Sequence, residues 1–122
     1  MKNTLIVLAI LFIGAITFTG FTSKKSNLLP TSLKITVLDG LGNIVEGAKV
    51  TIYTKEEDFK NSENPAQDPM FTNEKGVVQF KDIEARSYFV DVTKDKMTNY
   101  GAAQQTPVLQ AGKVNKVNIV ID

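Results

Sequence analysis

The chain has 122 residues, with 14 basic and 13 acidic side chains, a formal net charge of +1, and neither histidine nor cysteine. This length suits one domain, and the near-neutral charge argues against nucleic acid as a partner. Without histidine and cysteine, the chain cannot form Ser-His-Asp or Cys-His catalytic machinery, a disulfide or a lipid-modified cysteine.

The first recognisable segment is an uncharged apolar run, residues 4–21, which follows Lys2 and precedes a polar stretch. This order is the layout of a secretory signal. We therefore predict that residues 1–23 are a signal peptide, with an uncleaved N-terminal membrane anchor as the alternative, because the run is close to the length of a membrane span. Residues 24–32, which include Pro30, are predicted to be a linker. We expect a secreted, periplasmic or cell-surface protein that contacts the membrane only through its N-terminal segment.

From residue 33 to residue 122, apolar and polar residues alternate in short runs, which is typical of half-buried strands. The predicted strands are residues 33–38, 48–53, 70–72, 77–80, 88–93, 104–109 and 114–121. Pro107 makes 104–109 an edge strand, because proline has no backbone N–H to donate to a neighbouring strand. Residues 39–43, 73–76 and 94–101 are predicted turns. No helical period is convincing in this part, so we predict an all-β fold, a single β-sandwich of about seven strands.

The longest break between predicted strands is the polar segment 55–69, which carries five carboxylates against two lysines and contains Asn-Pro and Asp-Pro steps. We expect a solvated loop. Calcium binding is the alternative, but the Asp-x-Asp-x-Asp-Gly spacing of a calcium loop is absent. We therefore predict no metal and no cofactor. Phe59 could pack this segment down or meet a partner.

Glycines follow the first predicted strand, in the stretch DGLGNIVEG. Gly40 and Gly42 match the first half of the dinucleotide-binding pattern G-x-G-x-x-G, which cradles a pyrophosphate between a strand and a helix. Val45 stands at the third glycine's position, and the residues that follow alternate as a strand. We interpret the stretch as a turn between two strands.

A second hypothesis concerns Lys34 in the first predicted strand and Asn118 in the last. Such a pair can form an intramolecular isopeptide bond when it is buried beside a carboxylic acid that lowers the lysine pKa. Alternation places both side chains on outward faces. We therefore expect solvated surface residues.

Residues 33–54, LKITVLDGLGNIVEGAKVTIYT, resemble the opening of the carboxypeptidase regulatory-like domain, a transthyretin-like β-sandwich. The matching positions are Asp39, Gly42, Ile44, Val45, Gly47, Ala48 and Val50. The stretch TNEKGVVQFKDIEARSYFVDV is also similar, but Arg86 and Ser87 stand where the family usually has a glycine before Tyr88, so this turn must be built differently. The resemblance covers residues 33–122. It implies a fold and an accessory role, and it transfers no catalytic residues.

We therefore expect a non-enzymatic module for binding or for structural and accessory interactions at the cell envelope, with an envelope protein or a glycan as its unknown partner. The candidate binding residues are Tyr53, Phe59, Phe89 and Tyr100. If these aromatic side chains converge on an outer face, they would form a contact patch, which makes a carbohydrate-binding module the main alternative.

Two other functions stay open. A carboxylate-based hydrolase would need two acids, such as Asp91 and Glu84, to face one cleft. Self-association would use open sheet edges that accept a strand from another copy or a partner.

Overall fold

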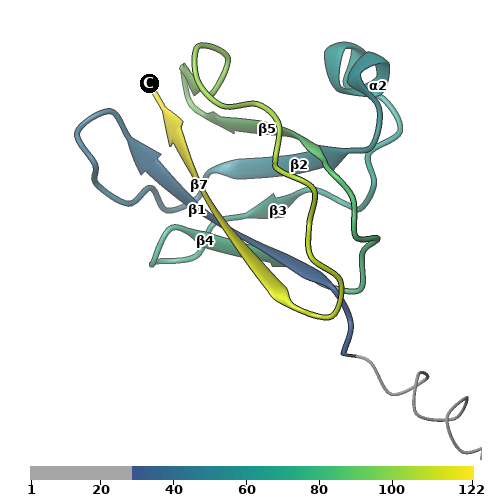
Figure 1. The fold of residues 1–122 in the computed structure, drawn as a ribbon. Coiled ribbons are helices and arrows are strands. Elements are labelled where there is room, and N and C mark those ends of the chain that lie inside the picture. Colours follow the sequence, from purple (N-terminus) through teal and green to yellow (C-terminus); the bar gives the residue numbers. More distant parts are fainter. Residues whose placement is uncertain (1–28) are drawn as a thin grey trace, which may run out of the picture.

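The structure is a computed structural model that describes residues 29–122 (Figure 1). The predicted signal peptide or anchor, residues 1–23, and most of the linker 24–32 lie outside the described residues. Between residues 29 and 122, none of the helices is long and apolar enough to cross a membrane.

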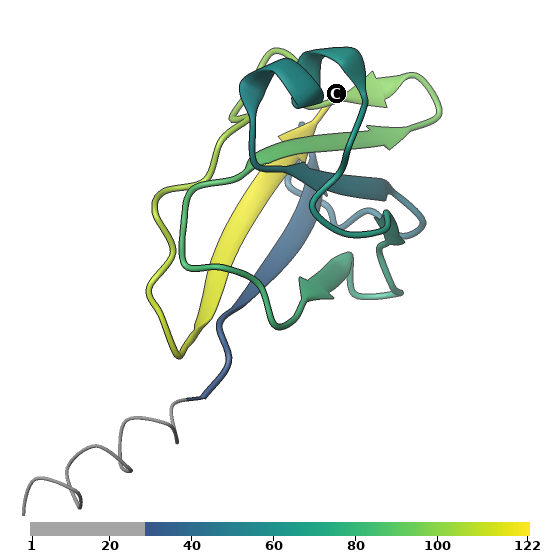
Figure 2. The same cartoon turned by 90° about the vertical axis from the view of Figure 1, so that its right-hand side faces the viewer.

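The described residues form two β-sheets that pack face to face (Figures 1 and 2). The three-stranded sheet, called sheet A here, consists in spatial order of β4 (Val77–Phe80), β1 (Ser32–Asp39) and β7 (Val114–Ile121). The four-stranded sheet, sheet B, consists of β3 (Met70–Phe71), β2 (Lys49–Tyr53), β5 (Phe89–Lys94) and β6 (Met97–Thr98). Strand neighbours are antiparallel except β1 and β7, which run parallel. The prediction of a single β-sandwich is confirmed.

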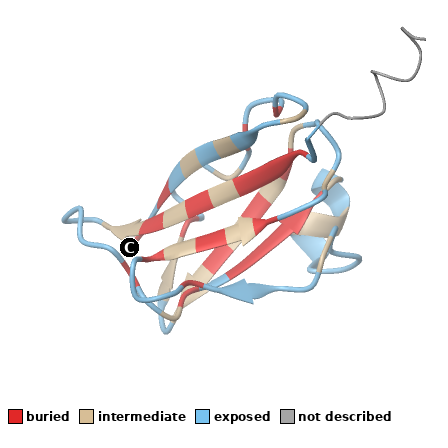
Figure 3. Ribbon diagram, turned by 90° about the horizontal axis from the view of Figure 1, so that it is seen from below, coloured by how far each residue is buried: buried red, intermediate tan, exposed pale blue. Residues whose placement is uncertain are grey.

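The core lies between the sheets and follows the alternation in the sequence. Buried and less buried residues alternate along β1 and β4 of sheet A and along β5 of sheet B (Figure 3). On β1, Leu33, Ile35 and Val37 are fully buried, and they meet Val90 and Val92 of β5 in the same apolar cluster. Burial of each such side chain stabilises the fold by about 1.5–3 kcal/mol, before the cost of ordering the chain is subtracted.

Five of the predicted strands are confirmed as β1, β2, β4, β5 and β7, with ends that differ from the prediction by at most one residue. The short strand predicted at 70–72 is confirmed as β3. The prediction of a turn throughout 94–101 is wrong, because Met97–Thr98 forms β6.

The strand predicted at 104–109 is also wrong, since only Gln105 forms an isolated bridge, to Phe89. The buried Asn99 side chain accepts the Val92 N–H at 3.0 Å and donates to the Val90 carbonyl at 2.8 Å. A side chain therefore occupies ladder positions on β5 that a further strand would have used.

The glycine stretch forms a turn, as predicted. Asp39 Oδ1 accepts the backbone N–H groups of Leu41 at 3.0 Å and Asn43 at 2.9 Å. These bonds, led by the one from Asn43, hold the pKa of the Asp39 carboxyl below its usual value. Gly42 has φ 88°, a left-handed conformation that favours glycine. The next regular element is β2, so no helix N-terminus is available for a phosphate.

The turn before Tyr88 is built with side chains, since the family's glycine is absent. The Tyr88 hydroxyl donates to the Glu84 carbonyl at 2.8 Å, and the Arg86 N–H donates to the same oxygen at 3.0 Å. The Arg86 guanidinium also donates to the Thr54 carbonyl at 2.8 Å. Arg86 thereby ties this turn to the end of β2.

Candidate functional site: a cleft on the outer face of sheet B

The segment 55–69 folds over the outer face of sheet B and contains a short helix, α2 (Glu56–Asn61), which lies above β2 and β5 (Figures 1 and 2). The prediction of a loop without a helix is wrong for Glu56–Asn61, whereas most residues of the segment are exposed to solvent, as expected. The first turn of α2 is acidic, which suits the positive end of a helix dipole. The helix ends at Ser62, whose φ of 54° is left-handed. A helix of six residues is not stable alone, so contacts with the sheet must hold it.

Phe59 provides the main contact between α2 and the sheet. Its ring lies 6.0 Å from that of Tyr53, edge to face, and 5.8 Å from that of Phe89, in a stacked arrangement. Two hydrogen bonds fix the rest of the segment: Ala66 N–H donates to the Ile52 carbonyl, and the Gln67 side chain donates to the Lys81 carbonyl. The segment is therefore an ordered cover.

The structure places the four candidate aromatic residues in different environments. Tyr53, Phe59 and Phe89 converge, but into a small packed cluster under α2. Tyr53 is only 4% exposed, so the expectation of an exposed side chain is wrong, and Phe59 and Phe89 are half-buried. The period of β2 was read correctly, since Tyr53 does face outward from the sheet, but the folded cover removes it from solvent. Tyr100 is 58% exposed and stands outside this cluster.

Beside the aromatic cluster, the cover and the sheet enclose a cleft of about 200 Å³. Its floor is the outer face of β2 and β5, and its far wall is the segment after α2. The lining residues are Lys49, Thr51, Tyr53, Ser62, Pro65, Pro69, Asp91 and Thr93. The register places Lys49 opposite Thr93 and Thr51 opposite Asp91. The floor of the cleft therefore combines threonine hydroxyls with one positive and one negative side chain.

Asp91 is the unusual residue of this cleft. Its Oδ1 atom is buried and has no hydrogen-bond partner among residues 29–122. Burial raises the pKa of the Asp91 carboxyl, and the nearby Tyr100 hydroxyl and the charge of Lys49 offset part of this rise. The charge of Asp91 in turn raises the pKa of the Tyr100 hydroxyl. A buried acceptor without a partner costs free energy, so Asp91 Oδ1 calls for a donor from outside the described residues, such as a ligand or a water.

The cleft can bind a hydrogen-bond donor, because a ligand hydroxyl or amine would satisfy Asp91 Oδ1. Asp91 is the one acid among the lining residues, whereas Glu84 lines a different pocket beside Tyr88. Two acids therefore do not face the cleft around Asp91, whereas Asp82 and Glu84 both line the pocket beside Tyr88. Among residues 29–122, no three acidic side chains gather closely enough to suggest a metal site.

Asp91 was expected only as one acid of a carboxylate-based hydrolase and not as a binding residue, although the sequence carries a signal for a special role. Aspartate is depleted in strands, yet Asp91 stands at the centre of the apolar run YFVDVT. Alternation placed it on the outward face, beside Phe89 and Thr93. What the sequence could not show is the cover that turns this exposed position into a cleft.

Lys34 and Asn118 both lie on the outer face of sheet A, as predicted. The register places Lys116 opposite Lys34 and Thr36 opposite Asn118. Asn118 is exposed and Lys34 is half-buried. The surface interpretation of these two residues fits this arrangement.

No protein-family model matches the chain, and no curated protein matches it. Among solved structures, it is similar to the Bacillus anthracis TIE protein, with 20% identity, a TM-score of 0.53 and coverage of 76% of this chain and 17% of that protein. It is also similar to BcpA, the major pilin subunit of Bacillus cereus, with 15% identity, a TM-score of 0.50 and coverage of 77% and 30%.

A third similar structure is the dioxygenase domain of a dioxygenase–carbohydrate-binding protein fusion from Streptomyces sp. SirexAA-E. Here the identity is 14%, the TM-score is 0.50, and coverage is 77% of this chain and 80% of that one. At these identities the likeness concerns the fold alone. The chain is a β-sandwich, and it spans a minor part of the TIE protein and of the pilin subunit.

Proposed function

We propose that the chain is an exported, non-enzymatic accessory module that binds a partner at the cell envelope through the cleft around Asp91. The observation that carries this proposal is the buried Asp91 Oδ1 without an internal partner, at the floor of an ordered cleft. A β-sandwich serves many functions, so the support for binding is the chemistry of this cleft and not the fold. The pilin subunit among the similar structures supports an accessory role in general terms.

We also propose that the domain is a divergent member of the carboxypeptidase regulatory-like family. The support is local: the turn that Asp39 closes and Gly42 permits has the residues of the family's opening motif. The Tyr88 turn departs from the family's pattern but is closed by Arg86 instead. Membership would agree with an accessory role and would supply no catalytic residues.

A carbohydrate ligand is the second candidate, and Tyr100 favours it. This ring is 58% exposed and interacts with Asp91 through its hydroxyl. Sugar recognition combines an aromatic surface for the apolar face of the ring with acceptors for the sugar hydroxyls. A carboxylate with a free oxygen beside an exposed tyrosine provides both. Tyr53 and Phe89 do not contribute such a surface, because they are covered.

The test of the binding site uses the 24–122 fragment, which contains both sheets and the whole described core. The fragment is applied to a broad glycan array and, with a chemical cross-linker, to a native envelope preparation. We expect a bound glycan or envelope protein whose retention falls at least tenfold, about 1.4 kcal/mol, in Asp91→Asn. Glu84→Gln is the control, because this exposed acid lies outside the cleft. Equal retention by both variants would contradict the proposed site.

Two further measurements separate the parts of the proposal. Tyr100→Ala should abolish glycan binding if the ligand is a sugar, and silence across the array would remove that candidate. Export is tested by N-terminal sequencing of the chain recovered from the envelope and the medium, where a start near residue 24 is expected. Hydrolytic turnover that Asp91→Asn abolishes would contradict a non-enzymatic role.

A further inference from the structure

The outer face of sheet A carries two lysines directly opposite each other. The strand registers place Lys34 of β1 beside Lys116 of β7 on one side and Gln79 of β4 on the other. Lys116 is exposed and Lys34 is half-buried. Like charges directly opposite on a sheet are destabilising, so this row is suited to a negatively charged partner.

The strand residues around this row offer no internal partner. The side chains that share this outer face by alternation are Ser32, Thr36, Leu38, Val77, Val114, Asn118 and Val120. None of them is acidic, and between residues 29 and 122 the one salt bridge is that of Lys60 with Glu56, on the other side of the molecule. The two lysines are therefore uncompensated in the described chain.

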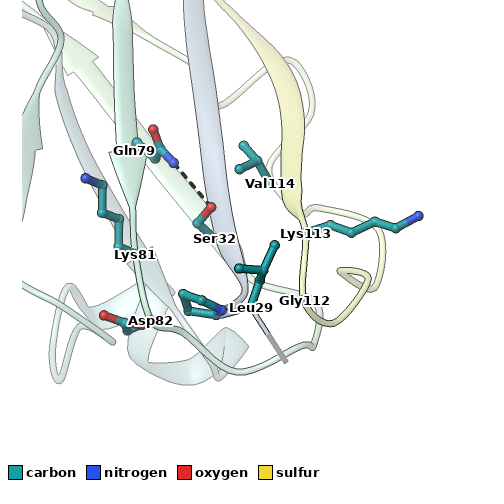
Figure 4. A pocket seen from close by; sticks show the side chains of 9 residues that line it. Leu29, Ser32, Gln79, Lys81, Asp82, Gly112, Lys113 and Val114 are labelled. Carbon is teal, nitrogen blue, oxygen red and sulfur yellow. Dashed lines mark hydrogen bonds between the residues drawn. The ribbon is translucent and has the colours of Figure 1, made fainter. Parts of the chain in front are cut away.

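The same face continues into a pocket at the end of sheet A (Figure 4). The cavity has about 290 Å³ and lies beside Ser32 and Gln79, whose side chains are hydrogen-bonded at 3.3 Å. Its walls include Leu29 and Val114, which are 72% and 50% exposed. Lys81, Lys113 and Asp82 complete the rim. We call Lys34, Lys116, Lys81 and Lys113, together with this pocket, the lysine face.

The opposite side of the sandwich has the complementary composition. The cover of sheet B, residues 55–69, carries five carboxylates against two lysines, and one of these lysines is paired with Glu56 at 3.2 Å. The carboxylates are Glu56, Glu57, Asp58, Glu63 and Asp68, and all but Asp58 are exposed. Met70 and Phe71, which follow at once, are 37% and 65% exposed. We call residues 55–71 the acidic cover.

We propose that the lysine face of one copy of this chain binds the acidic cover of a second copy. A second copy fits on two counts: the excess charges are opposite, and each surface has an apolar part, the pocket on one and Met70 with Phe71 on the other. Because the two surfaces lie on opposite sides of the sandwich, the contact is head-to-tail. Such a contact repeats and gives open chains unless its rotation closes a ring.

The association should be weak and sensitive to salt. Exposed ion pairs contribute about 0.2–1 kcal/mol each, so several must act together with the apolar contact. Between about 10 mM and about 1 M salt the screening length falls from about 30 Å to about 3 Å. Strand addition at a sheet edge rests on backbone hydrogen bonds and would lack this dependence.

The first experiment is sedimentation of the 24–122 fragment, and of the full chain in detergent, over a range of protein and salt concentrations. We expect species larger than the monomer at low salt that disappear as salt is added. A strict monomer at low salt would overturn the proposal. Association that is unchanged by high salt would also overturn it and would favour edge pairing.

The second experiment reverses the charges. Lys34→Glu with Lys116→Glu, and separately Glu57→Lys with Glu63→Lys, should each weaken association at least tenfold, about 1.4 kcal/mol. All four changes in one chain, or a mixture of the two double variants, should restore it, because the charges are again opposite. Rescue of this kind would not follow if the substitutions only disturbed folding.

The matched control is Lys75→Glu with Glu46→Lys, which changes exposed turn residues outside both surfaces and should leave association unchanged. A loss in this control, or no rescue, would overturn the head-to-tail contact. Vesicles of anionic lipid and a soluble polyphosphate serve as further probes. If the lysine face binds these and the fragment remains monomeric at low salt, the partner is a polyanion and the proposal is wrong.

Discussion

The two outer faces of this sandwich differ in whether a segment of the described chain covers them. The outer face of sheet B is covered by an ordered segment with a helix, and its aromatic residues are packed beneath it. No such segment among residues 29–122 covers the outer face of sheet A, which presents Lys34 and Lys116 side by side. One connection, residues 54–69 between β2 and β3, accounts for the difference.

This comparison shows where specific sites arise on a small sandwich. Sheet B has a cleft because its cover leaves a gap over Asp91. Binding in this cleft would depend on burial and on a hydrogen bond to Asp91 Oδ1. Sheet A offers a broader surface on which charge is the main property. The covered face suits a small ligand, whereas the bare face suits a large partner.

The largest expected effect comes from removing the contact that seats the cover. Phe59→Ala deletes the ring packed on Tyr53 and Phe89, and we expect the free energy of unfolding to fall by about 2 kcal/mol, less than for a fully buried ring because Phe59 is half-buried. Limited proteolysis should then cut within residues 55–69. Phe71→Ala is the control, since Phe71 is 65% exposed and its loss should have little effect. Equal protection in both variants would mean that the backbone bonds alone hold the cover.

A smaller effect, of opposite sign, is expected at the floor of the cleft. Asp91→Asn removes a charge that burial disfavours, so the free energy of unfolding at neutral pH should rise by about 0.5 kcal/mol, a modest value because the carboxylate is partly exposed and screened. Denaturant titration of both proteins measures the difference. A clear loss of stability would show that Asp91 makes a favourable internal bond.

The pH dependence of that difference has a definite sign. The pKa of Asp91 is raised in the folded state, so the folded protein holds this proton more tightly than the unfolded chain. The contribution of protonated Asp91 is therefore lost as the pH rises through the raised pKa. As the pH falls from neutral toward 3.8, the ordinary value, the wild type should gain stability relative to Asp91→Asn. A constant difference would show that the carboxyl titrates normally.

The smallest effect concerns the bare face. Lys116→Gln relieves the repulsion from Lys34, so the monomer should gain a few tenths of a kcal/mol, about 0.3 kcal/mol, at low salt. Added salt should remove the gain, because it screens the repulsion. Lys75→Gln, in an exposed turn, is the control and should show no such gain. Thermal unfolding at low protein concentration makes this comparison without interference from association.

The same two faces explain which predictions from the sequence succeeded. Period-two alternation in 33–38, 48–53, 88–93 and 114–121 correctly identified strands and their inward residues, because one face of each strand must meet the core. Alternation also assigned Tyr53, Phe89 and Asp91 correctly to an outer face. It failed to give their exposure, since the residues that cover them come from a separate segment.

The failures have particular causes. The acidic run of residues 56–58 has no helical period of its own, and α2 forms because Phe59 anchors it on the sheet. The strand expected at 104–109 is replaced in part by the side chain of Asn99, a competition that no periodicity reveals. The opposition of Lys34 and Lys116 depends on the register of two strands that are far apart in the sequence.

The sequence by itself determined the sandwich, the inward side chains and the Asp39 turn, because alternation and turn chemistry act over a few residues. Only the tertiary structure decided that one outer face is covered and that, within the described part of the chain, the other is not. The cleft at Asp91 and the lysine pair both need segments that meet through folding. Their chemistry therefore depends on distances in space that spacing along the chain does not encode.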